Sequence, residues 1–68
     1  MSKIVQCKFY PETDFILTEI RNEDLEEIKS KFIAVEIYEG DEKCSVSLSK
    51  PQAEQFVEYL NQLIKELE

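Results

Sequence analysis

The chain has 68 residues, of which 43% are hydrophobic and 34% are charged, and its formal net charge at pH 7 is −7. This composition is typical of one small globular domain, residues 1–68, and an acidic chain is repelled by nucleic-acid phosphates and anionic membranes. Histidine is absent and glycine occurs once, which excludes histidine-based catalysis, histidine metal sites and glycine-rich phosphate-binding loops.

Two strands are predicted in the amino-terminal third of the chain. Residues Lys3–Tyr10 (KIVQCKFY) alternate between apolar and polar side chains, which indicates a strand that Pro11 ends. Residues Phe15–Arg21 (FILTEIR) are rich in β-branched and aromatic side chains and form the second strand. The facing of this second strand stays open, because its odd and its even positions both carry apolar residues.

A short helix of two or three turns is predicted for the next segment, Asn22–Phe32 (NEDLEEIKSKF). Leu25, Ile28 and Phe32 are spaced three and four apart, as on one face of a helix. Asn22 can cap the amino end, and the acidic residues come early and the lysines late, which suits the helix dipole. A loop over residues 22–31 is the alternative.

An antiparallel hairpin is predicted next. Its strands are Phe32–Glu39 (FIAVEIYE) and Lys43–Ser49 (KCSVSLS), and both alternate clearly between apolar and polar positions. The turn between them contains Gly40-Asp41, where glycine supplies the positive φ that tight hairpin turns need.

The carboxyl-terminal segment predicts a long amphipathic helix that begins at Lys50. Ser49 and Gln52 have the spacing of a capping box, and Pro51 lies in the first turn, where proline is tolerated. We expect its apolar stripe to cover the hairpin, although a coiled-coil seam or an anchor in a partner's groove would have the same spacing. The stripe consists of Ala53, Phe56, Val57, Leu60, Leu63, Ile64 and Leu67.

The predicted fold class is α+β: a small antiparallel sheet of about four strands, in the order ββ(α)ββα, with one face covered by the carboxyl-terminal helix. The other face of such a sheet is bare, and an aromatic-rich patch on it is typical of an interface. Self-association through this patch is one expected use. The predicted partner-binding residues on this outer face are Tyr10, Phe15, Leu17, Phe32 and Tyr38.

Carboxylates are concentrated in two polar segments, which we interpret as hydrated surface and as a second partner-binding region. The function expected is a small, acidic, non-enzymatic protein-binding module, an inhibitor or adaptor that acts on a basic partner. Its specific version is nucleic-acid mimicry, in which carboxylates occupy the groove of a nucleic-acid-binding protein. No catalytic, cofactor or metal site is expected. The acidic partner-binding residues are Glu23, Asp24, Glu26, Glu27, Glu39, Asp41 and Glu42.

The two cysteines and the absence of targeting segments predict a cytoplasmic protein. Cys7 and Cys44 stand alone in strand-like segments, where we expect buried thiols; a bridge between them or a redox role is the alternative. The first residues (MSKIVQCKFYPETD) lack the apolar stretch of a signal peptide, and no run is long enough to cross a bilayer.

The junction SVSLSKPQAEQFVEYL, a strand that runs into a capped helix, resembles the positive-cofactor-four coactivators. The resemblance implies a curved four-stranded sheet with a helix, dimerisation and binding of single-stranded DNA. That binding needs basic and aromatic residues along the sheet, whereas Glu19 and Glu36 lie among the aromatic residues here. On the basis of this resemblance, the alternative is that the chain is a homodimeric single-stranded nucleic-acid-binding protein. A self-assembling structural subunit is a further alternative.

Overall fold

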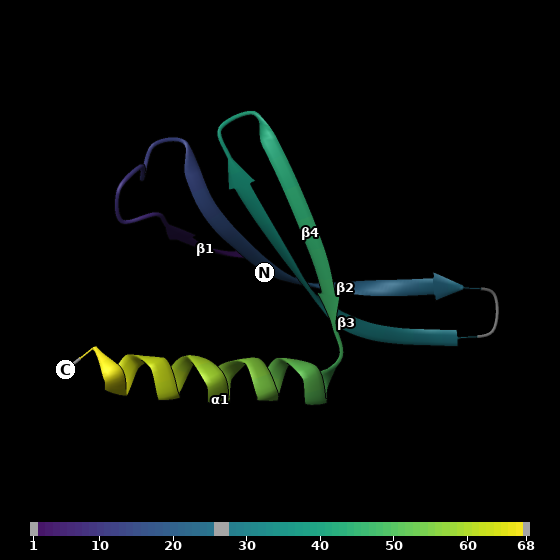
Figure 1. Cartoon of the computed structure of the whole chain (residues 1–68). Coiled ribbons are helices and arrows are strands. Elements are labelled where there is room, and N and C mark those ends of the chain that lie inside the picture. Colours follow the sequence, from purple (N-terminus) through teal and green to yellow (C-terminus); the bar gives the residue numbers. More distant parts are fainter. Residues whose placement is uncertain (1, 26–27, 68) are drawn as a thin grey trace.

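A computed structural model describes residues 2–25 and 28–67 of the chain. Within these residues it contains the strands β1 (Ser2–Gln6), β2 (Asp14–Leu25), β3 (Ile28–Glu39) and β4 (Glu42–Leu48), followed by the helix α1 (Lys50–Glu66). The strands form one antiparallel sheet in the order β1-β2-β3-β4 (Figure 1). The helix packs on one side of this sheet against β3 and β4, so the predicted α+β class is confirmed.

The first strand is shorter than predicted, because β1 ends at Gln6. A turn follows in which the backbone N–H groups of Thr13 and Asp14 both donate to the carbonyl of Tyr10, at 3.3 Å and 2.9 Å. Pro11 has no N–H to donate to a neighbouring strand, which favours a turn here. Tyr10 therefore lies in the connection between β1 and β2 and not on the sheet, which corrects its predicted placement.

The helix predicted for residues 22–31 is not formed. Residues 22–25 extend β2 and residues 28–31 begin β3, with Asn22 opposite Lys31, Glu23 opposite Ser30 and Leu25 opposite Ile28. A strand pair that is already in register gains backbone hydrogen bonds with each added residue pair, whereas a new short helix must first be nucleated. Residues 26 and 27 lie outside the described part of the chain.

The hairpin of β3 and β4 forms as predicted, with Gly40 and Asp41 as its two-residue loop. Gly40 has φ of +61°, and no other described residue has a positive φ. A positive φ at the first central residue alone is the signature of a type II′ turn, whose twist matches that of the flanking strands.

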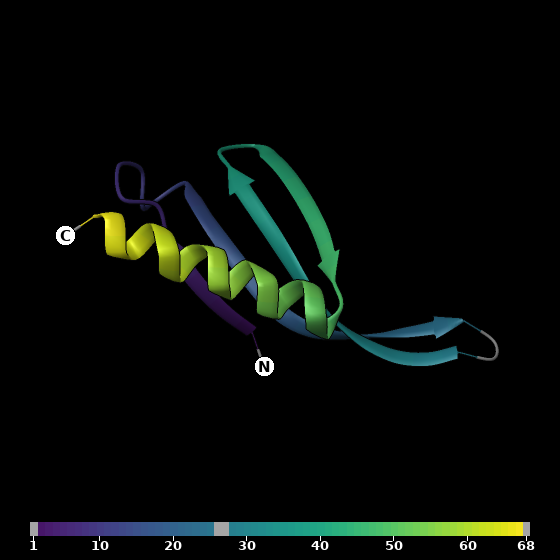
Figure 2. The same ribbon diagram turned by 60° about the horizontal axis from the view of Figure 1, so that its bottom comes forward.

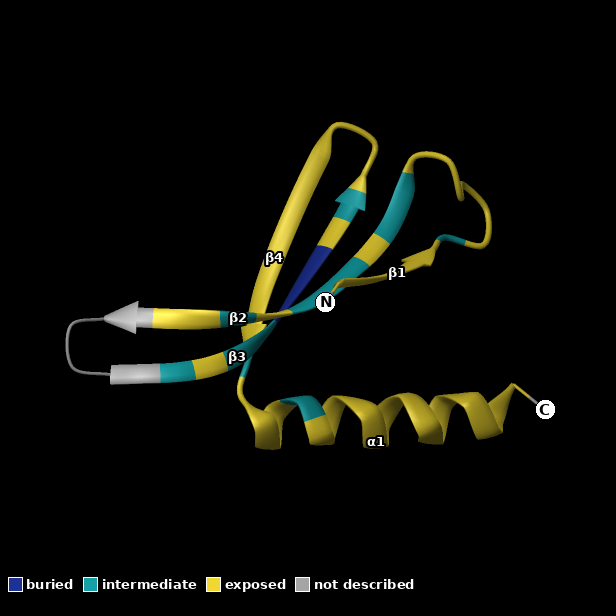
Figure 3. Cartoon of the chain, turned by 180° about the vertical axis from the view of Figure 1, so that it is seen from behind, coloured by how far each residue is buried: buried dark blue, intermediate teal, exposed yellow. Residues whose placement is uncertain are grey.

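The strand register assigns every strand residue to one of two faces. The centre of the helix-side face is apolar apart from Thr18 and consists of Val5, Ile16, Thr18, Ile20, Ile33, Val35, Ile37, Cys44, Val46 and Leu48. Toward its edges and ends the same face carries Lys3, Asp14, Asn22, Lys31, Glu39 and Glu42. The outer face mixes apolar and charged residues and consists of Ile4, Gln6, Phe15, Leu17, Glu19, Arg21, Phe32, Ala34, Glu36, Tyr38, Lys43, Ser45 and Ser47. Burial is greatest in the middle of β3, at Ala34, Val35 and Glu36 (Figure 3).

The helix begins where predicted. Ser49 is extended, Pro51 lies in the first turn, and the Ser49 N–H donates to the Gln52 side-chain oxygen at 2.9 Å. Figure 2 shows α1 running along one side of the sheet, and it meets the strands near its amino-terminal end. In the apolar stripe only Ala53 is half-buried, and the remaining members are exposed. The expected sealing of the sheet face is therefore limited to the first turns of α1.

Candidate functional site

The β3–β4 turn brings several acidic side chains to one end of the sheet. In the register, Asp14 lies opposite Glu39, and Glu39 lies opposite Glu42, so three carboxylates stand in a row across β2, β3 and β4. Asp14 is held in place, because its Oδ1 accepts hydrogen bonds from the Gly40 N–H and from the Thr13 hydroxyl, both at 3.0 Å. We call Asp14, Glu39 and Glu42 the carboxylate row.

No cation neutralises the carboxylate row within the described residues. The ion pairs found there all use Glu19 or Glu36, which lie on the outer face. Glu39, Asp41 and Glu42 are exposed to solvent. Like charges directly opposite each other on adjacent strands are destabilising, so the chain retains an electrostatic repulsion here that an approaching cation would relieve.

The two predicted acidic segments are not brought together. Glu23 lies near the far end of the β2–β3 hairpin, where the Ser30 hydroxyl donates to its carboxylate at 3.0 Å. Figure 1 shows that end pointing away from the turn that holds Glu39, Asp41 and Glu42. Asp24 belongs to the same end of β2, and the predicted residues Glu26 and Glu27 lie outside the described part of the chain.

Four of the five predicted outer-face residues do share that face: Phe15, Leu17, Phe32 and Tyr38. Phe15 and Tyr38 stack on each other, with ring centroids 4.5 Å apart and an angle of 17° between the planes. The four side chains are half-buried. Neighbouring side chains therefore cover much of this face even though no second layer lies on it.

A charged network occupies the centre of the outer face. Glu36 is 2% exposed, and its carboxylate accepts hydrogen bonds from the Arg21 guanidinium and, at 2.5 Å, from the Tyr38 hydroxyl. Lys43 Nζ lies 3.0 Å from the same carboxylate, and the Arg21 Nε donates to Glu19 at 2.6 Å. The buried charge is thus fully partnered, as burial of a carboxylate requires.

These partners stabilise the charged forms of the network. The hydrogen bond from Tyr38, followed by those from Arg21 and Lys43, lowers the pKa of Glu36 to about 2. The hydrogen bond to Glu36 raises the pKa of Lys43 and also that of Arg21. All three groups therefore remain ionised near neutral pH, and the two cations of the face are already neutralised by carboxylates.

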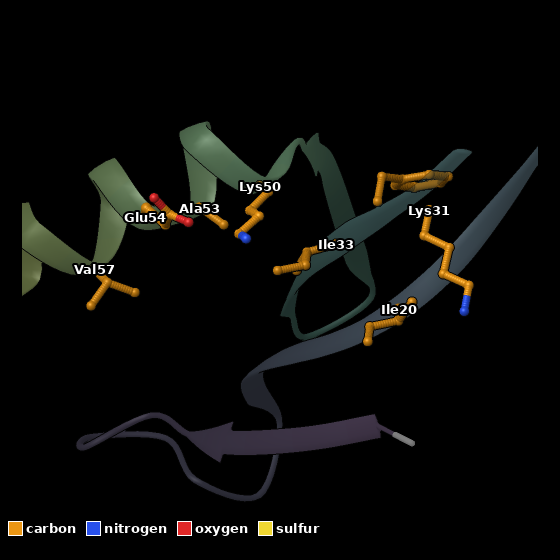
Figure 4. A pocket seen from close by; sticks show the side chains of 8 residues that line it. Ile20, Lys31, Ile33, Lys50, Ala53, Glu54 and Val57 are labelled. Atoms are coloured by element: carbon orange, nitrogen blue, oxygen red, sulfur yellow. The ribbon is translucent and has the colours of Figure 1, made fainter. Parts of the chain in front are cut away.

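A groove that sequence reasoning missed lies between α1 and the helix-side face. It has a volume of about 410 Å³, and its lining includes Ile20 and Ile33 from the sheet and Ala53 and Val57 from the helix. Figure 4 shows these side chains facing one another across the gap. The signal in the sequence is the apolar stripe itself, which we expected to cover the hairpin of the same chain.

The described residues also bear on the expectations for the cysteines, for metal ligands and for membrane-spanning helices. Both cysteines are free thiols, so the alternative of a bridge between them is not formed. The expectation of buried thiols is wrong for Cys44, which is exposed, and is not met by Cys7, which is half-buried. Among the described residues, no cluster of three potential metal ligands occurs. The one described helix is neither long nor apolar enough to cross a membrane.

No protein-family model matches this chain, and neither the curated proteins nor the solved structures that were compared with it give a match. The surfaces of the molecule are therefore the guide to its function.

Proposed function

We propose that this protein is a small non-enzymatic binding module that acts as an inhibitor or adaptor on a basic protein. The observation that supports the proposal is the carboxylate row, in which Asp14, Glu39 and Glu42 stand opposite one another across the strands and form no ion pair with a described cation. A basic partner would remove the repulsion within the row and add favourable ion pairs at the same time.

Nucleic-acid mimicry is the specific version of this proposal. Neighbouring strands lie about 4.8 Å apart, so the row presents its charges at intervals of the same order as the roughly 3.4 Å of axis per phosphate in one DNA strand. The partner would then be a protein whose basic groove ordinarily holds nucleic acid. The net charge of −7 on the chain would steer such a partner toward the row.

The chemistry of the chain supports a binding role and a cytoplasmic location. The sequence contains no histidine, and the carboxylate with the clearest pKa shift, Glu36, is shifted toward the ionised form by its partners. A general acid at neutral pH would need a shift in the opposite direction. Two free cysteines, Cys7 and Cys44, are typical of a reducing compartment.

The test is an affinity pull-down from a lysate of the source cells with the tagged chain at low and at high salt. The row variant combines Glu39→Gln with Glu42→Gln. The control variant combines Glu58→Gln with Glu66→Gln, which removes the same charge from exposed positions of α1. We expect the wild type and the control to retain a basic protein at low salt, and the row variant to lose it, because screening and neutralisation act on the same ion pairs.

Competition with duplex DNA then separates mimicry from other protein binding. A mimic should release its partner as DNA is added, since both occupy the same groove. A captured protein that persists at high salt, or that the row variant retains fully, would show that the carboxylate row is not the binding surface.

A single-stranded nucleic-acid-binding homodimer is the second candidate. It is favoured by the stacked Phe15 and Tyr38 on an open sheet face, with Lys43 Nζ 5.5 Å from the Tyr38 ring centroid. Aromatic rings beside cations are the usual platform for bases, although Glu36 neutralises Lys43 and Arg21 here. Fluorescence anisotropy with labelled single-stranded oligonucleotides tests this candidate, and a flat titration at low salt removes it.

A further inference from the structure

The chain exposes far more surface than a folded protein of its mass. Its accessible surface is 6366 Å² for a mass of 8.0 kDa, whereas a compact monomer of that mass exposes about 4,500 Å². Its radius of gyration is 14.2 Å, compared with about 11 Å for a compact chain of this length. The excess amounts to about 1,900 Å², and a surface of that size requires an explanation.

Large exposed apolar side chains lie both on the helix-side face and on α1. On the helix-side face, Ile20 is 65% exposed and Val46 is 52% exposed. On α1, the exposed members of the stripe are Phe56, Val57, Leu60, Leu63, Ile64 and Leu67. One chain therefore exposes an apolar sheet face and an apolar helix surface that do not cover each other.

The stripe on α1 is broad enough to contact two neighbours. At 100° per residue, Val57 and Ile64 lie on the flank that faces the sheet, as Figure 4 shows for Val57. Phe56 and Leu63 lie on the opposite flank, 80° or more away around the helix. The series Ala53, Phe56, Leu60, Leu63 and Leu67 is spaced 3-4-3-4, which is the seam spacing of paired helices.

We propose that a second copy of this chain covers the groove in a two-fold symmetric dimer. The helix of each copy packs along the seam of the other helix and beneath the helix-side face of the other sheet. A two-fold interface must be complementary to itself, and here one chain supplies both an apolar helix and an apolar sheet face. If each copy buries its excess of about 1,900 Å², the interface totals about 3,800 Å², within the range of obligate homodimers.

The charges around the groove permit this pairing. Its ionisable lining residues are Lys31, Lys50 and Glu54, which carry a net positive charge on a chain of −7. The carboxylate row is on the same helix-side face but lies at its far end, beside the β3–β4 turn. At physiological salt, charges separated by more than about 8 Å are largely screened. Two acidic copies can therefore associate through this surface, and the outer face stays free.

The dimer is independent of the proposed basic partner, and its test uses the purified full-length chain alone. Light scattering coupled to size-exclusion chromatography, at about 10 µM and about 100 µM, should give twice the chain mass of 8.0 kDa. Leu60→Glu places a charge in the middle of the seam and should give the monomer mass. Gln62→Glu adds the same charge on the opposite side of α1, 160° from Leu60, and should leave the dimer intact.

A third variant, Leu17→Glu, places the same charge on the outer face. A wild type that is monomeric at about 100 µM overturns the proposal. So does a dimer that persists in Leu60→Glu and is lost in folded Leu17→Glu, because the interface would then be the outer face. Circular dichroism establishes that each variant is folded before its mass is interpreted.

The reactivity of Cys44 gives a second readout that needs no variant. This thiol is exposed in the single chain, on the helix-side face opposite Ile37, and the proposed dimer covers it. With about nine-tenths of the chains paired, Cys44 should react with a thiol reagent roughly tenfold more slowly than it does after dilution to monomer. A dimer in which Cys44 reacts as fast as in the monomer overturns the proposed interface.

Discussion

The two faces of the sheet satisfy their side chains in different ways. On the outer face, which carries the network around Glu36, Ala34 and Glu36 are each 2% exposed and Phe15 stacks on Tyr38 within the same chain. On the helix-side face, whose centre is apolar, Val5 is 66% exposed and Ile20 is 65% exposed. A polar network can be completed by a few neighbouring side chains, whereas an apolar face needs an entire second layer. The helix-side face is thus the one that depends on another molecule.

The largest effect is expected from two substitutions at directly opposed positions of the helix-side face, one buried and one exposed. Val35 and Val46 face each other across β3 and β4, and they are 9% and 52% exposed. Val35→Asp buries a charge without a partner and should cost about 4 kcal/mol, comparable to the whole stability of a chain this small. Val46→Asp should leave the fold intact and weaken only the dimer.

Urea denaturation followed by circular dichroism measures both variants, and sedimentation gives their mass. Equal losses of stability at the two positions in a monomeric chain would contradict the comparison, since they would show that one chain covers both valines.

The second prediction concerns the effect of protein concentration on thermal unfolding. If the helix-side face is covered by a second copy, raising the concentration from about 1 µM to about 100 µM should stabilise the dimer by about 2.7 kcal/mol. For two chains of this length that corresponds to a rise of about 10 °C in the unfolding midpoint. Leu60→Glu serves as the control, and its midpoint should not move. If the unfolding midpoint of the wild type stays constant over this concentration range, no second copy covers the helix-side face.

Local patterns predicted much of this architecture. Gly40-Asp41 between two alternating segments gave the β3–β4 hairpin, and the spacing of Ser49, Pro51 and Gln52 gave the start of α1. Residues 22–31 misled the prediction for a physical reason. Their early acids and late lysines suit a helix dipole, but the same order also places Asp24 opposite Lys29 when the segment folds back as a hairpin.

Local patterns could not predict which chain packs against the helix-side face. A stripe such as Phe56, Leu60 and Leu63 has one spacing whether it packs on its own sheet or on another chain, because periodicity reports which side of a helix is apolar and nothing about its partner. The carboxylate row had a similar limit. Glu39 and Glu42 are close in sequence, but Asp14 joins them only through the β2–β3 register.

The third prediction tests the outer face through its pH dependence. The folded pKa of Glu36 is about 2, below the usual value of about 4.3, so its contribution to stability is complete above pH 4.3 and is lost as the pH falls toward 2. Glu36→Gln should be less stable than the wild type at pH 6, and the difference should shrink between pH 4.3 and pH 2. Urea denaturation at several pH values measures this difference.

Two controls show whether the pH dependence of Glu36→Gln arises from the outer face of a single chain. Glu58→Gln removes an exposed carboxylate from α1, and its stability should track that of the wild type at every pH. The loss in Glu36→Gln should also be the same at low and high protein concentration, because the partners of Glu36 belong to its own chain. A loss that grows on dilution would mean that the outer face is completed by another copy.

The smallest predicted effect is a gain in stability at the carboxylate row. Glu39 faces Asp14 on one side and Glu42 on the other, so Glu39→Gln removes two repulsive pairs and should stabilise the chain by about 0.5 kcal/mol at low salt. The gain should vanish near 1 M salt, where the screening length falls to about 3 Å. Asp14→Asn is a poorer choice, because the Asp14 carboxylate also accepts the Gly40 N–H. If Glu39→Gln stabilises the free chain and also weakens capture of a basic partner, the carboxylate row lowers the stability of the chain in favour of binding. If Glu39→Gln instead destabilises the chain at low salt, the carboxylates do not repel one another.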